Sequence, residues 1–466
     1  MHGSMRRREA TPASRLVRAA LDASRRPYHG GADVPEGPVS LDSVQVRFDE
    51  QRLISDVGLL LCASLADRLG IEGLVNESVW LDPRAPGAAL PGRKVMSLVH
   101  GMLAGADSIH DMNVLRAGST GLILGHRVMA PSTLGTFLRA FTFGHVRQLD
   151  RVLDQALCRA WQAGAGPDDG PLVIDIDSFI GEVHGYHKQG ASYGYTKKLG
   201  YHPIVAVRAD TGEVLHIRNR KGKANTQRGA ERFVDELLAR VHRAGYTDTI
   251  VIRADVGFEN HKLFKILDAR GIEFSIGVKH STKIKRLIEQ SPETDWVTVP
   301  DYPEGGEAQI AETKLGDWRL IVRRTRLVGA QAELFPDWRY HCFATNRTVP
   351  MLTADTDHRD HATVELAIRD LKDQALCHFP SGQFAANSAW TAIAALAHNL
   401  GRWTTQIGLP SAPVQTARAR RRQLLQIPAR LTRTSRQWTL RMPARWPWQH
   451  QFSTVLDKIR ALTALA

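Results

Sequence analysis

Three aspartates that end strand-like runs are the first residues in this sequence that could support chemistry. Asp175 and Asp177 lie two positions apart in VIDIDSF, and Asp255 directly follows the apolar run TIVIR. Alternate residues of a strand share one face, so Asp175 and Asp177 point the same way while Ile174 and Ile176 face the other side. An acidic face on a central strand is costly unless the acids are paired or bind a metal ion. These carboxylates are therefore candidates for a metal site.

Asp255 has two interpretations that fit its position equally. Open α/β sheets usually place their functional sites at the carboxyl ends of strands, where Asp255 is expected. Aspartate is also a frequent helix N-cap, so Asp255 could instead begin the next helix.

A further acid lies in the run HRDHATVELAIRDLK. His358, His361, Glu365 and Lys372 stand at i, i+3, i+7 and i+14, a spacing that predicts one stripe along a single helix. The stripe could be a solvated face, with Glu365 and Arg369 as an ordinary i, i+4 ion pair. His361 and Glu365 could also bind zinc, although the sequence offers neither a third ligand nor the H-E-x-x-H spacing.

The elements that must position these acids begin after the linker GAGPDDGP, where the apolar period changes. PLVIDIDSF and two runs joined by an Asp210-Thr211-Gly212 turn predict three antiparallel strands. The stripe from Phe233 to Val241 predicts a helix, and a strand, a helix and a fifth strand follow up to IEFSIGV. The expected fold is α/β, with a mixed sheet flanked by helices.

We expect six segments along the chain. They are a basic flexible arm over 1–45, a helical DNA-binding or dimerisation region over 46–165, the first part of a core over 171–290, a β-rich insertion subdomain over 291–344, the second part of the core with the Glu365 helix over 345–405, and a basic Arg/Trp-rich segment over 406–466. Within the helical region, RVMAPSTLGTFLRAF is similar to the opening of a helix-turn-helix, with Ser132 or Thr133 as N-cap and Arg139 pointing outward. Short helices of this kind also occur in ordinary helical domains.

Composition narrows the class of partner. The 61 Lys and Arg outnumber the 48 Asp and Glu, so the net charge is +13 and a polyanion such as nucleic acid is expected. No stretch approaches the roughly 18 apolar residues of a membrane span, and no long basic amphipathic helix favours a membrane surface. The start MHGSMRRREA lacks the apolar run of a secretory signal, so we expect a cytoplasmic protein. Four widely spaced cysteines argue against a zinc ribbon or a disulfide framework.

The C-terminal region concentrates positive charge. Residues 411–450 hold nine arginines, no acid and three tryptophans, with a predicted strand pair around Thr434–Gln437. Arginines can neutralise DNA phosphates, and tryptophans can stack on unpaired bases. Trp438, Trp446 and Trp448 could equally pack this segment onto the core.

The blocks VIDIDSF, IRADVGF and the E-x6-K from Glu365 to Lys372 resemble the three signature blocks of DDE transposases, in particular those of bacterial insertion sequences called DDE domain group 1. The resemblance covers about residue 50 to the end, including GYTKKLGYHPIVAV and the tail IPARL…RMPARWPW. It implies an RNase H-like core with a helical N-terminal domain and a β-rich insertion. It also implies an enzyme that binds terminal inverted repeats, cuts DNA and transfers strands.

By the same resemblance, Asp177, Asp255 and Glu365 would be the catalytic residues and hold two Mg²⁺ ions, which Mn²⁺ could replace. Asp175 remains an alternative to Asp177, because it shares the strand face. The implied partners are double-stranded DNA of the element ends and the target, and a second copy in a homodimeric active complex, acting at the bacterial nucleoid without a membrane partner. The expected DNA contacts are Lys372, Arg359, His361, Arg420, Arg421 and Arg422.

This chain departs from the family pattern before the glutamate. Related transposases often have Tyr, Arg, Arg there, whereas this chain has His358, Arg359, Asp360 and His361. Arg359 could replace the usual arginine, or His361 could contact a phosphate.

Two alternatives to a transposase stay open. A stand-alone RNase H-like DNA nuclease would use the same acids to cut DNA without joining it. A transposase-derived protein without catalysis would only bind DNA.

Overall fold

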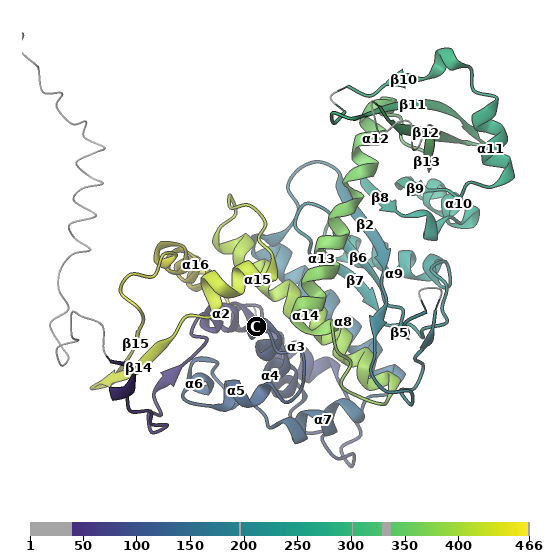
Figure 1. Ribbon diagram of the computed structural model, residues 1–466. Coiled ribbons are helices and arrows are strands. Elements are labelled where there is room, and N and C mark those ends of the chain that lie inside the picture. Colours follow the sequence, from purple (N-terminus) through teal and green to yellow (C-terminus); the bar gives the residue numbers. More distant parts are fainter. Residues whose placement is uncertain (1–39, 195–196, 301, 329–336, 465–466) are drawn as a thin grey trace, which may run out of the picture. The chain divides into compact units, whose positions relative to one another are not determined.

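The computed structural model describes residues 40–194, 197–300, 302–328 and 337–464 (Figure 1). The chain divides into two compact units, Met1–Glu50 and Gln51–Ala466. The described part of the first unit contains a 3-10 helix at Leu41–Ser43, and its side chains are exposed. The basic arm predicted over 1–45 lies outside the described residues except for 40–45.

After the short strand β1 (Leu53–Ile54), the second unit is helical up to Ala165, as the helical spacing of apolar residues predicts. They are α2 (Leu59–Arg68), α3 (Ile71–Ser78), α4 (Pro91–Ala104), α5 (Met112–Arg116), α6 (Thr120–Ile123), α7 (Pro131–Arg139) and α8 (Phe143–Ala160), which continues as a π-helical turn, η2 (Trp161–Ala165). The N-cap of α7 is Ala130, so the predicted caps Ser132 and Thr133 are wrong. Pro131 starts the helix because its fixed φ suits the first turn. Arg139 is exposed, as expected.

Five adjacent strands form one side of a nine-stranded mixed sheet that ends at β7: β2 (Leu172–Ser178), β6 (Ile204–Arg208), β7 (Val214–Arg218), β8 (Ile250–Ala254) and β9 (Glu273–Gly277). β2, β6 and β7 pair in antiparallel order, while β8 pairs parallel to β2 and β9 parallel to β8. The spatial order β9-β8-β2-β6-β7 is that of an RNase H-like core. Apolar runs suit β6 and β8, because these strands are buried on both faces.

The β-rich insertion continues this sheet rather than forming a sheet of its own. β10 (Val297–Thr298), β11 (Gly306–Leu315) and β12 (Trp318–Leu327) lead to β13 (Arg339–Thr345), which pairs antiparallel with β9. Phe343 lies opposite Gly277 in this register. The insertion thereby covers the edge of β9, whose backbone groups would otherwise lack partners.

A smaller sheet follows β2 directly. It contains β3 (Gly181–Glu182), β4 (Ser192–Tyr193) and β5 (Leu199–Tyr201), with β5 in the middle. Tyr201 and Phe379 form its small core, with ring centroids 5.0 Å apart.

Six helices accompany the large sheet: α9 (Ala230–Arg243), α10 (His261–Ala269), α11 (Thr282–Glu289), α12 (Met351–Arg359), α13 (Thr363–Leu371) and α14 (Phe384–Gly408). α14 contacts α8, α4, α2 and β7, so it packs against both the helical region and the sheet (Figure 1). Trp390 and Trp403 on this helix are fully buried. The helix is buried along most of its length, and its buried residues include polar ones such as Asn387, His398 and Arg402 as well as apolar ones.

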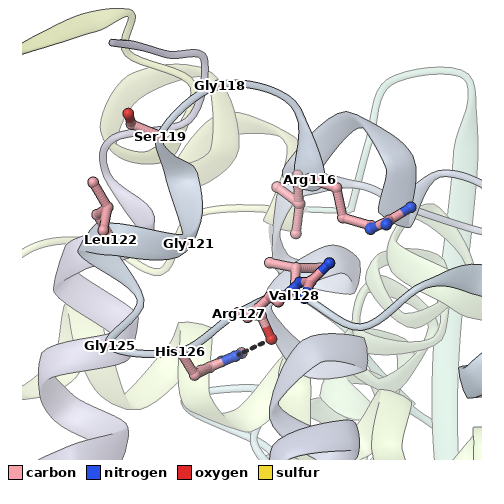
Figure 2. Close-up of a pocket in the computed structure, with 10 residues that line it drawn as sticks. Arg116, Gly118, Ser119, Gly121, Leu122, Gly125, His126, Arg127 and Val128 are labelled. Carbon is pink, nitrogen blue, oxygen red and sulfur yellow. Dashed lines mark hydrogen bonds between the residues drawn. The ribbon is translucent and has the colours of Figure 1, made fainter. Parts of the chain in front are cut away.

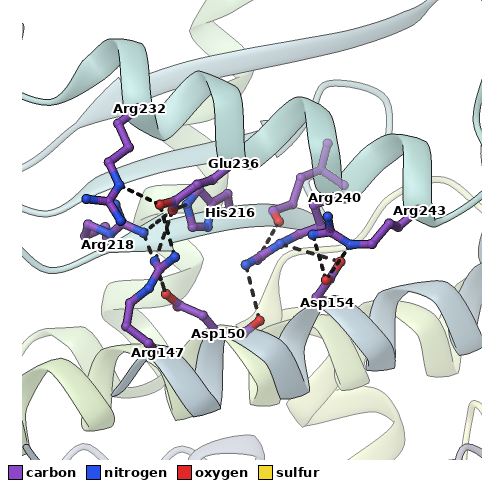
Figure 3. Close-up of polar contacts among 10 residues, drawn as sticks. Arg147, Asp150, Asp154, His216, Arg218, Arg232, Glu236, Arg240 and Arg243 are labelled. Atoms are coloured by element: carbon purple, nitrogen blue, oxygen red, sulfur yellow. Dashed lines mark hydrogen bonds and ion pairs between the residues drawn. The ribbon is translucent and has the colours of Figure 1, made fainter. Parts of the chain in front are cut away.

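An ion-pair network joins α8 of the helical region to β7 and α9 of the sheet (Figure 3). Glu236 on α9 contacts Arg147 at 3.0 Å, His216 at 3.3 Å and also Arg218. Burial alone would raise the pKa of Glu236, but hydrogen bonds from His216, Arg218 and Arg147 hold that pKa well below its usual range. Arg240 also donates to the Asp150 carbonyl oxygen, 3.2 Å away.

The C-terminal residues return to the helical region. α15 (Ala417–Arg420) and the π-helical turn η8 (Arg421–Leu425) precede a hairpin of β14 (Ala429–Thr434) and β15 (Gln437–Arg441), and α16 (Gln449–Ala461) ends the fold. The hairpin confirms the predicted strand pair. Its strand β14 also pairs with β1 (Leu53–Ile54).

No helix among the described residues is long and apolar enough to span a membrane. All four cysteines are free thiols.

Candidate active site

Asp177 and Asp255 come together because their strands are parallel neighbours. In the register of β2 with β8, Asp175 lies opposite Arg253 and Ile176 lies opposite Ala254. The residue that follows Ile176 is Asp177, and the residue that follows Ala254 is Asp255, so both aspartates lie at the carboxyl ends of their strands. The sheet therefore brings the two aspartates to the same edge, as the sequence predicts.

Burial and repulsion between carboxylates raise the pKa of an aspartate at this edge of the sheet. Burial raises the pKa of Asp177 to about 6, and the negative charges of Asp255 and Glu365 add to the rise. The backbone N–H of Ser178 donates to Asp177 Oδ1 at 2.6 Å, which opposes that rise. The dependence of this pKa on both other acids shows that all three lie in one electrostatic neighbourhood.

Asp255 serves both interpretations of its position. Its carboxylate accepts a hydrogen bond from Gly257 N at 3.0 Å and so caps the 3-10 turn Val256–Phe258. Desolvation by the surrounding protein raises its pKa, although the side chain reaches solvent. The cap uses one carboxylate oxygen and leaves the other available.

Glu365 stands in the first turn of α13, with an exposed side chain. The predicted single helical stripe from His358 to Lys372 is wrong, because α12 ends at Arg359 and a 3-10 turn, Asp360–Ala362, separates it from α13. This break allows His361 and Thr363 to turn toward β2, which a continuous helix face would not permit.

Both carboxylate oxygens of Asp175 interact with side chains of the protein. It is fully buried, and Arg253 donates to both of its oxygens, at 2.6 and 2.9 Å. Thr363 Oγ1 donates to Asp175 at 3.0 Å, and His361 Nδ1 lies 3.1 Å from its other oxygen. Asp175 therefore fastens the segment before Glu365 to the strand that carries Asp177.

His202 lies beside this edge of the sheet and is not among the residues that the sequence singled out. Its Nε2 lies 2.9 Å from Ser178 Oγ, and its Nδ1 lies 2.6 Å from the Ala224 carbonyl oxygen. Its charge also affects the pKa of Asp255. Its only signal in the sequence was its place in GYHPIVAV, one of the stretches carried by the family resemblance.

The predicted DNA contacts near the acids have different surroundings. The Lys372 ammonium lies 5.3 Å from the ring centre of Phe179, two residues beyond Asp177, and Arg359 is exposed. His361 is tied to Asp175. His358 stacks on Phe343, and burial lowers its pKa to about 3, so it is neutral at physiological pH.

Two of the three predicted C-terminal contacts lie in the interior. Arg420 is 1% exposed, and Arg421 is 9% exposed and pairs with Asp373. Only Arg422 of this run reaches the surface. The expectation that Arg420 and Arg421 contact DNA is not supported by these positions, because α15 and η8 pack both side chains inward.

The three acids have the chemistry of a site for hard cations. Within the described residues, Asp177, Asp255 and Glu365 form no ion pair, and carboxylate oxygens are the ligands that Mg²⁺ prefers. No group of three or more His, Cys, Asp or Glu in the described part of the chain is already close enough to hold a metal ion. The donor set therefore fits a divalent cation by its chemistry and its uncompensated charge.

A cavity of 550 Å³ lies elsewhere, in the helical region (Figure 2). Its lining includes Arg116, Gly118, Ser119, His126 and Arg127. It contains none of the three acids.

The strand order and the acids at the carboxyl ends of β2 and β8 define an RNase H-like enzyme. The chain belongs to the family described as transposase DDE domain group 1, whose sequence profile matches residues 36–464. It is therefore a DDE transposase, and membership implies a general dependence on divalent metal ions.

Among solved structures, the chain is similar to a piggyBac transposase in a synaptic complex with hairpin DNA, determined by cryo-electron microscopy. The sequence identity is 12% and the TM-score 0.47, over 89% of this chain and 84% of that chain. No curated protein matches this sequence significantly.

Proposed function

We propose that this transposase mobilises an insertion sequence by binding its terminal inverted repeats, cutting the DNA at the ends and joining them to target DNA. The observation that supports the proposal is the position of Asp177 and Asp255 at the carboxyl ends of neighbouring parallel strands, with Glu365 near enough to raise the pKa of Asp177 and no ion pair to any of the three acids among the described residues. Charges of one sign held together in this way need a cation when the site is loaded.

The three carboxylates would hold two Mg²⁺ ions, or Mn²⁺ in their place. Such ions stabilise both the attacking and the departing oxygen of an in-line phosphodiester displacement. Lys372, held at Phe179 beside the end of β2, would bind the DNA backbone as a point charge. Asp175 and Arg253 would keep the Glu365 segment in place.

Duplex DNA, at the element ends and at the target, is the partner that suits this chain. The net charge of +13 favours a polyanion, because binding to phosphates releases counterions. An insertion sequence has two ends, so we expect a homodimer in the active complex, acting at the bacterial nucleoid.

The test uses linear DNA that carries the inverted repeats flanking the gene, purified protein and Mg²⁺. Asp177→Asn, Asp255→Asn and Glu365→Gln should each abolish cleavage while leaving binding of the ends nearly intact, because each change removes a metal ligand and leaves the DNA surface. Asp360→Asn, an exposed acid in the turn before α13, is the matched control and should cut normally.

The products distinguish the functions. Cut and joined products support a transposase, cut products alone indicate a nuclease, and binding without cutting indicates a DNA-binding protein. Wild-type cleavage rates in any of the three acid variants would overturn the site assignment.

Metal exchange tests the same site independently. Ca²⁺ should permit DNA binding without cleavage, because it takes looser and more numerous ligands than an in-line two-metal site tolerates. A zinc chelator should have little effect. Activity that only Zn²⁺ restores would instead favour a site at His358 and His361.

A further inference from the structure

The hairpin of β14 and β15 is anchored at its base and exposed at its tip. Leu431 and Leu440 are direct cross-strand partners and pack toward the hydrophobic core. On the other side of β14, Leu53 of β1 lies opposite Arg430. Ser119 fixes β1 in turn, since its N–H donates to the Leu53 carbonyl oxygen at 3.0 Å. The base of the hairpin is therefore attached to the helical region through β1.

Six residues of the hairpin form what we call its polar face. Side chains alternate between the two faces of a strand. The residues next to Leu431 on β14 and next to Leu440 on β15 therefore point away from the core. Thr432 lies opposite Thr439, and Thr434 lies opposite Gln437. All six are exposed except the half-buried Thr432. The polar face is Arg430, Thr432, Thr434, Gln437, Thr439 and Arg441.

The polar face has the chemistry of a surface that reads DNA. It carries hydroxyl, amide and guanidinium groups, which hydrogen-bond to base edges, and it has no acid and no large apolar side chain.

Cations surround the polar face at the tip. Arg433 is exposed on the opposite face, with its guanidinium 5.2 Å from the ring centre of Trp438, and Arg436 is exposed in the turn. Ser435 takes a left-handed conformation, with φ 55°, which closes the turn next to Arg436. Arg433 and Arg436 are exposed, and residues 411–450 contain no acid, so the charge at the tip favours an anionic partner.

We propose that the β14–β15 hairpin enters the major groove of duplex DNA, with its polar face on the base edges and Arg433 and Arg436 at phosphates. The groove is about 12 Å wide and admits a two-stranded ribbon. The proposal rests on the proposed function and names the element that recognises the transposon end.

The place of the hairpin in the fold supports a recognition role distinct from chemistry. In Figure 1, β14 and β15 lie apart from β2 and from β10–β13. The cavity of Figure 2 adjoins its anchor, since Ser119 lines that cavity and bonds to β1. The hairpin would thus bind internal base pairs of the repeat rather than the phosphate that is cut.

The phosphate contacts are tested by salt dependence. Arg433→Gln and Arg436→Gln should each weaken binding to the repeat duplex and to a scrambled duplex alike. Each should lower the slope of log K against log[salt] by about 0.9, the value for one phosphate on duplex DNA. Arg151→Gln, at an exposed arginine of α8, is the control and should leave the slope unchanged.

Base reading is tested by discrimination between sequences. Gln437→Ala and Thr439→Ala should lower the preference for the repeat duplex over the scrambled duplex by about fivefold to 150-fold, with an unchanged salt slope. Thr247→Ala, at an exposed threonine before β8, should preserve the preference. Unchanged thermal midpoints establish that each variant is folded.

The proposal would be overturned if the salt slope were unchanged in both arginine variants, or if the sequence preference were unchanged in both polar-face variants. It would also be overturned if Trp438→Ala lost binding to single-stranded DNA but kept binding to duplex DNA. These outcomes leave cleavage by the wild-type protein intact. If the wild-type protein neither binds nor cuts the repeat duplex, the proposed function itself fails.

Discussion

Asp175 and Asp177 lie two positions apart on one strand but have different surroundings. Asp175 is fully buried and accepts two hydrogen bonds from Arg253. Asp177 has no cationic partner among the described residues, and its pKa is raised to about 6 by burial and by neighbouring acids. Protein partners therefore already use both oxygens of Asp175, whereas Asp177 is the member of the pair that we propose as a metal ligand.

Asp175→Asn should destabilise the protein by about 3–5 kcal/mol, because it leaves the charge of buried Arg253 without its partner. The urea midpoint measures the loss. Asp177→Asn removes a repelled charge and should not lower that midpoint.

A double variant separates the ion pair from general damage to the strand. Asp175→Asn with Arg253→Gln should recover much of the stability, since no buried charge is left alone. If the double variant is as unstable as the sum of the single variants, the ion pair does not explain the role of Asp175.

At the scale of elements, one buried acid links the end of α8, the β6–β7 hairpin and α14. Trp161 Nε1 donates to Glu213 at 3.2 Å, and Trp403 Nε1 donates to the same carboxylate. Burial raises the pKa of Glu213 to about 7, although Arg208 and the two indoles oppose that rise.

The raised pKa of Glu213 predicts a specific dependence of stability on pH. Between pH 4.5 and about 7 the Glu213 carboxyl holds its proton more tightly in the folded protein than in the unfolded chain. The free energy of unfolding of the protein therefore decreases as the pH rises through that window. Glu213→Gln removes the titration. The stability of this variant relative to wild type should therefore increase by up to about 3 kcal/mol from pH 4.5 to 7 and then level off. Urea midpoints at several pH values measure it, and a constant difference would contradict it.

The network around Glu236 predicts a contrast between neighbours on one helix. Glu236→Gln should weaken the attachment of α9 to α8 by about 3 kcal/mol, because several arginines lose a shared, largely buried partner (Figure 3). Asp235→Asn breaks a half-exposed pair with Arg270 and should cost under about 1 kcal/mol. Equal losses in the two variants would contradict a special role of the network.

At the scale of the whole molecule, the C-terminal segment both packs and presents charge. Phe452, Val455 and Ile459 of α16 are buried, and α16 contacts α14 and α2. Trp446 donates to the Gln423 carbonyl oxygen, whereas Trp438 is exposed. The packing interpretation therefore fits Trp446, and Trp438 stays at the surface of the hairpin.

Removing residues 449–466 should lower the thermal midpoint and expose apolar surface, because α14 and α2 lose a helix that covers them. Dye binding to exposed apolar surface and calorimetry measure both effects. Arg433→Gln with Arg436→Gln is the control and should leave the midpoint unchanged. A truncated protein with a native midpoint would show that α16 is dispensable for the fold.

Local sequence determined the types and order of the elements, since apolar periodicity depends on neighbours within a few residues. It also placed Asp177 and Asp255 at strand ends, Glu365 on a helix and a hairpin near Thr434. Together with the net charge and the signature blocks, this was enough to predict an RNase H-like transposase.

Tertiary structure alone decided the matters that depend on residues distant in the chain. Asp175 is paired with Arg253 because β8 pairs with β2 and places the two residues opposite each other. The insertion is part of the core sheet because β13 pairs antiparallel with the edge of β9. Arg420 turned inward while the hairpin turned its arginines outward, although both belong to one basic segment. Burial and register depend on which surfaces meet after folding, and no local pattern of residue types contains that information.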